Sequence, residues 1–147
     1  MVNVLIRSRE VADYIASEQD PKISALISIY STGDGPIHSR SYPFLGIRFD
    51  DMTPDHLYSG MHLFTEDQAK EIVQFVEKNK DRTNWLVHCD AGVSRSGAVG
   101  TWIYEKLNNL RGLPVEQVRL YNGNFRLENP QIQPNPYILR LMRKVGG

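Results

Sequence analysis

Four short apolar segments, separated by longer stretches of mixed polarity, constrain the fold of this 147-residue chain more than any other feature. They span residues 3–6, 25–30, 44–49 and 85–88, and Gly, Pro, Asp or Ser bounds them. Ile, Val, Leu and aromatic side chains dominate these segments, which is typical of buried β-strands. The sequence therefore predicts four strands of one sheet.

Amphipathic stretches between and after these segments predict helices. A capping box opens the first, over residues 65–78, and the second begins near residue 95 and carries apolar side chains as far as Leu107. A proline suits the first turn of each of two more, over residues 114–121 and 136–145. No repeat, low-complexity tract or linker separates these parts, so we expect one α/β domain over residues 1–147.

Composition excludes several classes of protein. The formal net charge is zero, so no overall field draws the chain to nucleic acid or to an anionic membrane. No stretch approaches the roughly 18 apolar residues of a membrane span, and the apolar run at the N-terminus is too short for a secretory signal. A single cysteine rules out an internal disulfide and fits a reducing compartment. We therefore expect a cytoplasmic protein without nucleic-acid, membrane or obligate protein partners.

That cysteine, Cys89, lies in the segment His-Cys-Asp-Ala-Gly-Val-Ser-Arg-Ser, residues 88–96. A predicted strand precedes it and a predicted helix follows it, so residues 89–95 must turn the chain between the two. At such a junction, unpaired backbone N–H groups and the positive end of the helix dipole can meet one anion. Gly92 permits a positive φ within the turn. The segment therefore predicts a cradle for a phosphate group.

The residue types in this loop also fit nucleophilic chemistry on phosphorus. The same amides, the helix end and Arg95 favour the thiolate form of Cys89, which then needs no dedicated base. Five residues separate Cys89 from Arg95, which lets the loop curl until the guanidinium meets two phosphate oxygens. The Ser96 hydroxyl can donate to the sulfur as negative charge returns to it. A buried structural thiol would leave the glycine and the flanking serines unexplained.

The segment closely resembles the Cys-x5-Arg signature loop of the protein tyrosine phosphatase superfamily, and it is most similar to the dual-specificity branch. The resemblance covers roughly residues 25–144. It implies an α/β domain with a central, mostly parallel sheet flanked by helices. It also implies a phosphatase without metal or cofactor, in which Cys89 attacks phosphorus and Arg95 holds the transferring group. The loop amides implied to bind that group are those of Asp90, Ala91, Gly92, Val93, Ser94 and Arg95.

The general acid must come from elsewhere in the chain, because the leaving oxygen needs a proton. Three carboxylates, Asp50, Asp51 and Asp55, follow the third predicted strand. In the family the acid lies on a loop after a strand upstream of the cysteine, and the run Leu-Gly-Ile-x-x-x-Asp resembles the stretch that ends in it. The resemblance favours Asp51 over Asp50, with Asp55 third. Asp51 lies 38 residues before Cys89, farther than is usual in small members, with extra residues around positions 56–63.

Two further residues are predicted to support the site. His88 directly precedes the nucleophile, and we expect it to hydrogen-bond locally and fix the loop. Asn135 lies in a Pro-Asn segment that resembles one in dual-specificity phosphatases, where the Asn side chain helps to brace the phosphate loop; the alternative is a turn that begins a helix. His56 and His62 lie near acids in the sequence, but no third ligand has a recognisable spacing. We therefore predict no metal site.

The predicted substrate is a phosphorylated protein or peptide. A chain of 147 residues leaves little room for the N-terminal extension that deepens the pocket of larger tyrosine-specific relatives. We therefore expect phosphotyrosine, and also phosphoserine and phosphothreonine, as substrates. Phosphoinositide phosphatases often place Lys in this loop, whereas Asp90 follows the cysteine here. Two alternatives stay open: a phosphate-recognition module with little turnover, and a phosphatase of phosphoinositides or RNA 5′-phosphates. The Cys-x5-Arg spacing argues against a rhodanese-type sulfurtransferase.

Overall fold

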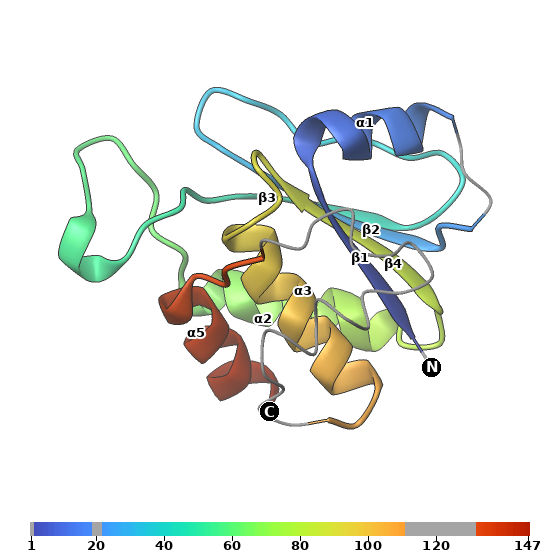
Figure 1. Cartoon of the computed structure of the whole chain (residues 1–147). Helices are drawn as coiled ribbons and strands as arrows, with labels where there is room; N and C mark the ends of the chain where they lie inside the picture. The colour runs from blue at the N-terminus through green and yellow to red at the C-terminus, as the bar shows by residue number, and fades with distance from the viewer. Residues whose placement is uncertain (1, 19–21, 111–131) are drawn as a thin grey trace.

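Four parallel strands form the centre of the protein, and helices cover both faces of the sheet (Figure 1). The structure is a computed structural model that describes residues 2–18, 22–110 and 132–147. The predicted four-stranded sheet is confirmed, and every pairing between these strands is parallel. The sheet order is β1-β4-β2-β3. The strands are β1 (Asn3–Ser8), β2 (Ala25–Tyr30), β3 (Phe44–Arg48) and β4 (Asn84–Cys89).

The register of the sheet brings the carboxyl ends of neighbouring strands together. Ser8, the last residue of β1, lies opposite Cys89, the last residue of β4, and Ser28 of β2 lies opposite His88. In open parallel sheets, ligands bind beyond the carboxyl ends of the strands, where the chain turns into the next element. Cys89 therefore begins a loop at the carboxyl end of the parallel strands, where a binding site is expected.

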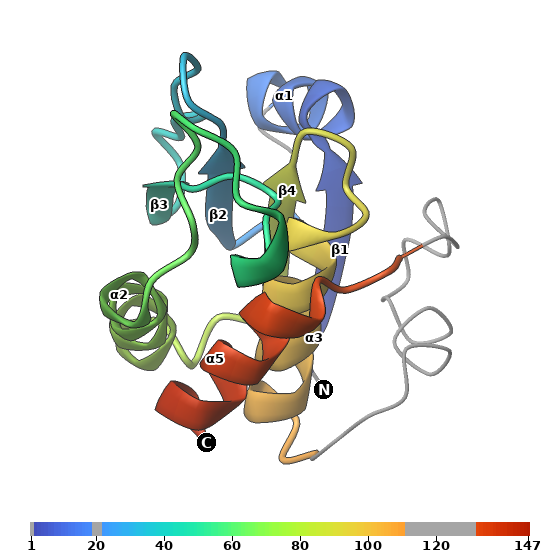
Figure 2. The same cartoon turned by 90° about the vertical axis from the view of Figure 1, so that its left-hand side faces the viewer.

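The helices divide between the two faces of the sheet. α1 (Arg9–Ser17) covers one face, whereas α2 (Glu66–Lys78), α3 (Arg95–Leu107) and α5 (Pro136–Gly146) cover the other (Figure 2). The two predicted helices that follow the last strand within the described residues are thus confirmed as α3 and α5. The helix predicted over residues 114–121 lies outside the described residues. α1 is a helix for which the sequence pattern predicted no bounds.

Strand side chains alternate between these two helical layers. Leu26 and Leu86 pack with α1, whereas their chain neighbours Ile27 and Val87 pack with the helices of the other face. Parallel strands covered on both faces have continuous apolar sequences, which is why the sequence pattern located them. In the described parts of the chain, no helix combines the length and the apolar character that crossing a membrane requires.

Side-chain caps set the start of three helices, and at α1 the Ser8 hydroxyl accepts from the backbone N–H of Val11. The Thr65 hydroxyl accepts from the backbone N–H of Gln68, and the Gln68 side chain accepts from that of Thr65, so the predicted capping box is confirmed. Asn135 caps α5 by accepting from the backbone N–H groups of Tyr137 and Ile138. These local bonds satisfy N–H groups that have no partner within the helix.

The connection between β3 and α2 stands away from the rest of the molecule (Figure 1). We call this segment the acid loop (residues 50–63); it contains one short 3-10 helix, η1 (Pro54–His56). A reciprocal pair of hydrogen bonds joins its ends: the Asp50 N–H donates to the His62 carbonyl, and the His62 N–H donates to Asp50 Oδ2, both at 2.7 Å. The region in which the sequence predicted extra residues therefore forms a loop whose two ends are hydrogen-bonded to each other.

Candidate active site

The phosphate loop (residues 89–95) joins β4 to α3 and lies against the end of β1. Gly92 adopts φ +73°, and a Cβ added to it would lie 2.4 Å from the backbone of Arg7 and of Ser8. Glycine alone fits both this conformation and this space. The Arg9 N–H donates to the Asp90 carbonyl at 3.1 Å, which ties the loop to the start of α1. The turn between strand and helix is thus fixed by its neighbours as well as by its own glycine.

Cys89 begins this loop with Ser96 directly beside it. The Cys89 Sγ and Ser96 Oγ atoms are 3.1 Å apart, and both residues are buried. Ser96 belongs to the first turn of α3, so the sulfur lies at the N-terminal end of that helix, where the dipole is positive. A hydroxyl donor and a helix N-terminus are therefore both placed to stabilise negative charge on the sulfur.

The guanidinium of Arg95 is held by groups from three different segments. Nη1 donates to the Phe49 carbonyl at 2.8 Å and to Ser31 Oγ at 2.9 Å, and Nη2 donates to Asp90 Oδ2 at 3.0 Å. Arg95 is 5% exposed, so its orientation is set within the protein. Burial would raise the pKa of the Asp90 carboxyl, but hydrogen bonds from Ser31 and Arg95, together with the Arg95 charge, hold that pKa below its ordinary value. Asp90 is therefore ionised at neutral pH.

His88 supports the loop from within the sheet. It is fully buried, its Nε2 lies 2.6 Å from Ser28 Oγ, and its Nδ1 lies 3.1 Å from the Cys89 carbonyl oxygen. Because a carbonyl only accepts, Nδ1 carries the hydrogen and Nε2 accepts from the Ser28 hydroxyl. Burial lowers the pKa of His88 to about 4, which preserves this neutral form at neutral pH. His88 thus holds the carbonyl of the cysteine by a local hydrogen bond.

Asp51 reaches the phosphate loop from the acid loop. Its Oδ1 accepts from Ser94 Oγ at 2.8 Å and from Asn135 Nδ2 at 2.9 Å. Among the described residues no hydrogen bond uses Oδ2, and Asp51 is exposed. One carboxyl oxygen is therefore anchored, and the other is available at the rim of the phosphate loop.

Asn135 contacts the site differently from the sequence prediction. That prediction has its side chain brace the phosphate loop, whereas in the structure Nδ2 donates to Asp51 Oδ1 and to the Met52 carbonyl, and Oδ1 caps α5. The contact with the phosphate loop is made by the backbone, since the Asn135 N–H donates to the Ser94 carbonyl at 3.0 Å. Both ends of the side-chain amide are occupied by the acid loop and the helix start, so the side chain orients Asp51.

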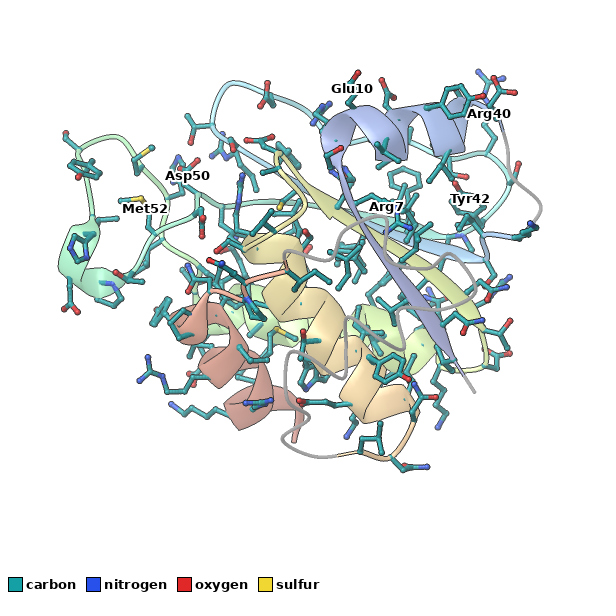
Figure 3. The ribbon with its side chains drawn as sticks, in the orientation of Figure 1. Arg7, Glu10, Arg40, Tyr42, Asp50 and Met52 are labelled. Carbon is teal, nitrogen blue, oxygen red and sulfur yellow. The ribbon has the colours of Figure 1, made fainter. Side chains whose placement is uncertain are left out.

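Asp50 and Asp55 have surroundings that differ from those of Asp51. Asp50 is 4% exposed at the base of the acid loop (Figure 3), where it accepts from the N–H and hydroxyl of Thr32 and from the N–H of His62. Burial would raise its pKa, but these hydrogen bonds and a nearby arginine charge lower it, so Asp50 is ionised with both oxygens occupied. Asp55 is exposed on η1. Among these acids, the contacts with the phosphate loop that the structure shows are made by Asp51.

Sequence reasoning missed Ser28 and Ser31. Ser28 lies in β2 and accepts the backbone N–H of Ile37 while it donates to His88, and Ser31 directly follows the same strand. One signal could have indicated both residues. It is a polar residue near the carboxyl end of an apolar strand, where ligands bind in parallel sheets.

Comparison with solved structures identifies the fold. Human DUSP28 matches with a TM-score of 0.63 at 16% sequence identity, over 99% of this chain and 95% of its own. DUSP15 matches with a TM-score of 0.60 at 18% identity, over 99% of this chain and 84% of its own. PTPMT1 in complex with PI(5)P matches with a TM-score of 0.55 at 15% identity, over 98% of this chain and 90% of its own. This is the dual-specificity phosphatase fold.

No protein-family model and no curated protein matches the sequence. At 15–18% identity, the structural similarity establishes the dual-specificity phosphatase fold, and activity is a property of the site rather than of the fold.

The surface beside Asp51 is hollowed. A cavity of about 390 Å³ is lined by Asp51, Thr53 and His56 of the acid loop and by Ser94 of the phosphate loop, with residues 133–136. Ligand sites typically have volumes of about 300–1,000 Å³. Ser94 is the residue of the phosphate loop that lines this cavity, and Cys89 and Arg95 are not among the lining residues. The cavity therefore lies on the Asp51 side of the site.

Proposed function

We propose that this chain is a cysteine-dependent phosphatase that hydrolyses phosphate monoesters through a phosphocysteine formed on Cys89. The observation that carries the proposal is the convergence of three chemically distinct groups on one loop. They are a thiol 3.1 Å from a hydroxyl, a guanidinium fixed by three segments, and a carboxyl anchored to the loop by Ser94. A site that only binds phosphate needs the guanidinium and the amides, but neither the thiol nor the acid.

In the first step the Cys89 thiolate attacks phosphorus, and the bond between phosphorus and the leaving oxygen breaks. Arg95 and the amides of residues 90–95 bind the oxygens of the transferring group as charge spreads over them. The leaving oxygen takes the electron pair of the broken bond and a proton from Asp51. Oδ2 can carry that proton because Oδ1 is held by Ser94 and Asn135. The products are an alcohol or phenol and the phosphocysteine.

In the second step water attacks the phosphorus atom of the phosphocysteine. Asp51, now ionised, takes a proton from that water, and the bond between sulfur and phosphorus breaks. The electron pair returns to the sulfur, to which the Ser96 hydroxyl donates from 3.1 Å. Inorganic phosphate leaves, Asp51 is again protonated and Cys89 is again a thiolate. Every proton and electron pair is supplied by the chain, the substrate or water, so the reaction needs no cofactor.

The substrate that we propose is a phosphorylated protein or peptide carrying phosphotyrosine, phosphoserine or phosphothreonine. The Asp90 side chain is 47% exposed beside the nucleophile, so its carboxylate repels a second phosphate group near the first. This disfavours phosphoinositides and RNA 5′-phosphates. PTPMT1, whose structure contains PI(5)P, shares the fold, so the fold alone does not decide the substrate. The proposal places the protein in the cytoplasm, without nucleic-acid, membrane or obligate protein partners.

Phosphate release from a substrate panel tests the proposal. The panel contains phosphotyrosine, phosphoserine and phosphothreonine peptides, phosphoinositides and RNA 5′-phosphates. We expect release from the peptides, and Cys89→Ser should retain less than about 1% of it, because this loop cannot ionise an alcohol. Mass spectrometry of acid-quenched enzyme should find phosphate on the peptide that contains Cys89. Thermal unfolding of Cys89→Ser checks that the variant is folded.

Each other outcome has a definite meaning. Phosphopeptide binding without phosphate release identifies a recognition module. Phosphate release from phosphoinositides or RNA 5′-phosphates, without release from peptides, is consistent with the proposed mechanism but contradicts the proposed peptide substrate. Substantial turnover by Cys89→Ser refutes the phosphocysteine.

A further inference from the structure

Asp90, Ser31 and Arg95 form a closed ring of hydrogen bonds beside the nucleophile. Ser31 Oγ donates to Asp90 Oδ2 at 2.7 Å, Arg95 Nη1 donates to Ser31 Oγ at 2.9 Å, and Arg95 Nη2 donates to Asp90 Oδ2 at 3.0 Å. Asp90 directly follows Cys89 in the chain. A negative charge at this position opposes both a thiolate and a bound phosphate, so the carboxylate must contribute something that offsets this cost.

The hydrogens of the guanidinium show what the ring leaves available. Arg95 has five N–H groups. Both hydrogens of Nη1 are used, by Phe49 and Ser31, and one hydrogen of Nη2 is used by Asp90. Because Ser31 and Asp90 are bonded to each other, they occupy the edge of the guanidinium that Nη1 and Nη2 share. Among the described residues no hydrogen bond uses Nε–H or the second Nη2–H. These two lie parallel on the opposite edge, where a guanidinium can bind two oxygens of one phosphate.

We propose that Asp90 is a positioning residue: with Ser31, its carboxylate holds Arg95 so that the Nε and Nη2 edge faces the phosphate loop before substrate arrives. The catalytic consequence rests on the proposed function. A flexible arginine side chain loses rotamer freedom when it binds a ligand. A guanidinium that is already oriented does not lose this freedom during the reaction, and preorganised donors are what stabilise developing charge most effectively.

The backbone of the loop does not depend on the Asp90 side chain. The Asp90 carbonyl is held by the Arg9 N–H, and Gly92 is fixed by its close approach to β1. The Asp90 side chain is 47% exposed, whereas that of Arg95 is 6% exposed. A half-exposed carboxylate adds little to folding, so its bonds to Ser31 and Arg95 point to a role in orienting the arginine.

A double-mutant cycle between Asp90 and Arg95 tests the proposal. Asp90→Ala should lower kcat about 10- to 100-fold, the scale of a misplaced catalytic group, without raising KM, because a repulsive charge is also removed. Asp90→Asn keeps an acceptor oxygen and should recover part of kcat, and Ser31→Ala should lower kcat less than Asp90→Ala. In the Arg95→Ala background, Asp90→Ala should cause no further loss. Asp81→Ala, which removes an exposed carboxylate before the start of β4, is the matched control.

Three results overturn the proposal. The first is a kcat for Asp90→Ala within twofold of wild type. The second is that Asp90→Ala lowers kcat equally in the wild-type and Arg95→Ala backgrounds. The third is that the loss of kcat in Asp90→Ala equals the loss of Cys89 reactivity toward iodoacetate. If the wild-type protein releases no phosphate, the proposed function has failed, but the same cycle can be measured as orthovanadate affinity. Asp90→Ala should then weaken vanadate binding in the wild-type background and not in the Arg95→Ala background; equal effects in both overturn the positioning role.

Discussion

The two sides of the candidate site are built differently. On the phosphate-loop side the thiol, the guanidinium and the neighbouring hydroxyl are buried, with Arg95 5% exposed and Ser96 fully buried. The acid loop stands away from the body and exposes three large apolar side chains, Leu57, Tyr58 and Met61. In the proposed reaction the anion stays bound throughout, so donors fixed in advance serve it best. The proposed acid, Asp51, would release a proton and take one back, and the structure holds it by one oxygen only. On this proposal anion binding depends on the sheet and helix, whereas proton transfer depends on a few loop contacts.

Replacing Asp51 by Asn should abolish proton donation from the acid loop and leave anion binding by the phosphate loop intact. The amide oxygen can still accept from Ser94 and Asn135, so the loop should stay in place. General acid catalysis typically contributes about 10²–10⁴-fold, and kcat/KM on a phosphotyrosine peptide should fall by that factor. The loss should be smaller on an aryl phosphate with an acidic phenol, because its leaving oxygen needs less help. Steady-state kinetics on both substrates measures the difference.

The pH profile gives a second readout of the same substitution. The proposed mechanism needs a protonated acid and an ionised thiol together, so kcat/KM of the wild type should form a bell against pH. Asp51→Asn should lose the alkaline limb, whereas Asp50→Asn and Asp55→Asn, the matched controls, should keep it. A normal profile for Asp51→Asn, with the loss appearing at Asp50 or Asp55, would refute the assignment.

Replacing Arg95 by Lys should damage the phosphate-loop side although the charge is unchanged. A single ammonium group cannot contact the Phe49 carbonyl, Ser31 and Asp90 and also span two phosphate oxygens. Loss of one preorganised donor typically costs about 10²–10³ in kcat, and we expect a loss of that size. Arg140→Lys, on the exposed face of α5, is the control and should have wild-type kinetics. Near-normal kcat for Arg95→Lys would show that catalysis does not need a guanidinium that contacts two phosphate oxygens.

The two sides of the site also differ in how far the sequence predicted them. The phosphate loop follows from local signals: an apolar strand, a glycine that permits positive φ, and a helix start at Arg95. Each of these acts within a few residues of the cysteine, so the chain order of residue types is enough to locate them. The four strands were located for the same reason, since burial on both faces produces an unbroken apolar run.

The contacts that separate Asp50 from Asp51 are not local. Asp50 is bound by His62, 12 residues later, and Asp51 is bound by Ser94 and Asn135, 43 and 84 residues later. No periodicity or turn signal encodes such pairs, so the sequence ranked the two acids only through a family resemblance. Ser31 was missed for the same reason, because its partners lie 59 and 64 residues away.

Replacing His88 by Asn should change the pH dependence of stability. The folded-state pKa of His88 is about 4, below its ordinary value of 6.5, because of burial. Between these values the unfolded chain binds a proton that the folded protein excludes, so stability should fall as pH drops from 6.5 to 4, by about 3 kcal/mol in total. Asn keeps an N–H for the Cys89 carbonyl and cannot be protonated, so the variant should lack this slope.

Urea unfolding at several pH values measures the slope. The control is His56→Asn on the exposed η1, which should keep the wild-type slope. An unchanged slope in His88→Asn would mean that another group excludes the proton.

Replacing Asp50 by Asn should have the smallest effect on activity, and it sharpens the comparison because Asp50 ties the acid loop to the end of β2. Its carboxylate accepts from Thr32 after β2 and from His62 at the far end of the acid loop. An amide must turn a nitrogen toward one of these donors, and an unmet buried partner costs about 1–3 kcal/mol in the free energy of unfolding. Urea unfolding should show this loss, and Asp55→Asn, which changes an exposed carboxylate on η1, should stay within about 0.5 kcal/mol of wild type.

The kinetic result for Asp50→Asn then shows how the acid loop is held. If the Asp50–His62 closure is what places Asp51, kcat should fall by up to about tenfold, far less than the 10²–10⁴-fold expected for the acid itself, and the loss should not depend on the leaving group. A loosened Asp50–His62 closure affects every substrate alike, because it lowers the fraction of molecules in which Asp51 contacts Ser94. Unchanged stability together with a strongly leaving-group-dependent loss would reverse the roles of the two neighbours and make Asp50 the proton donor.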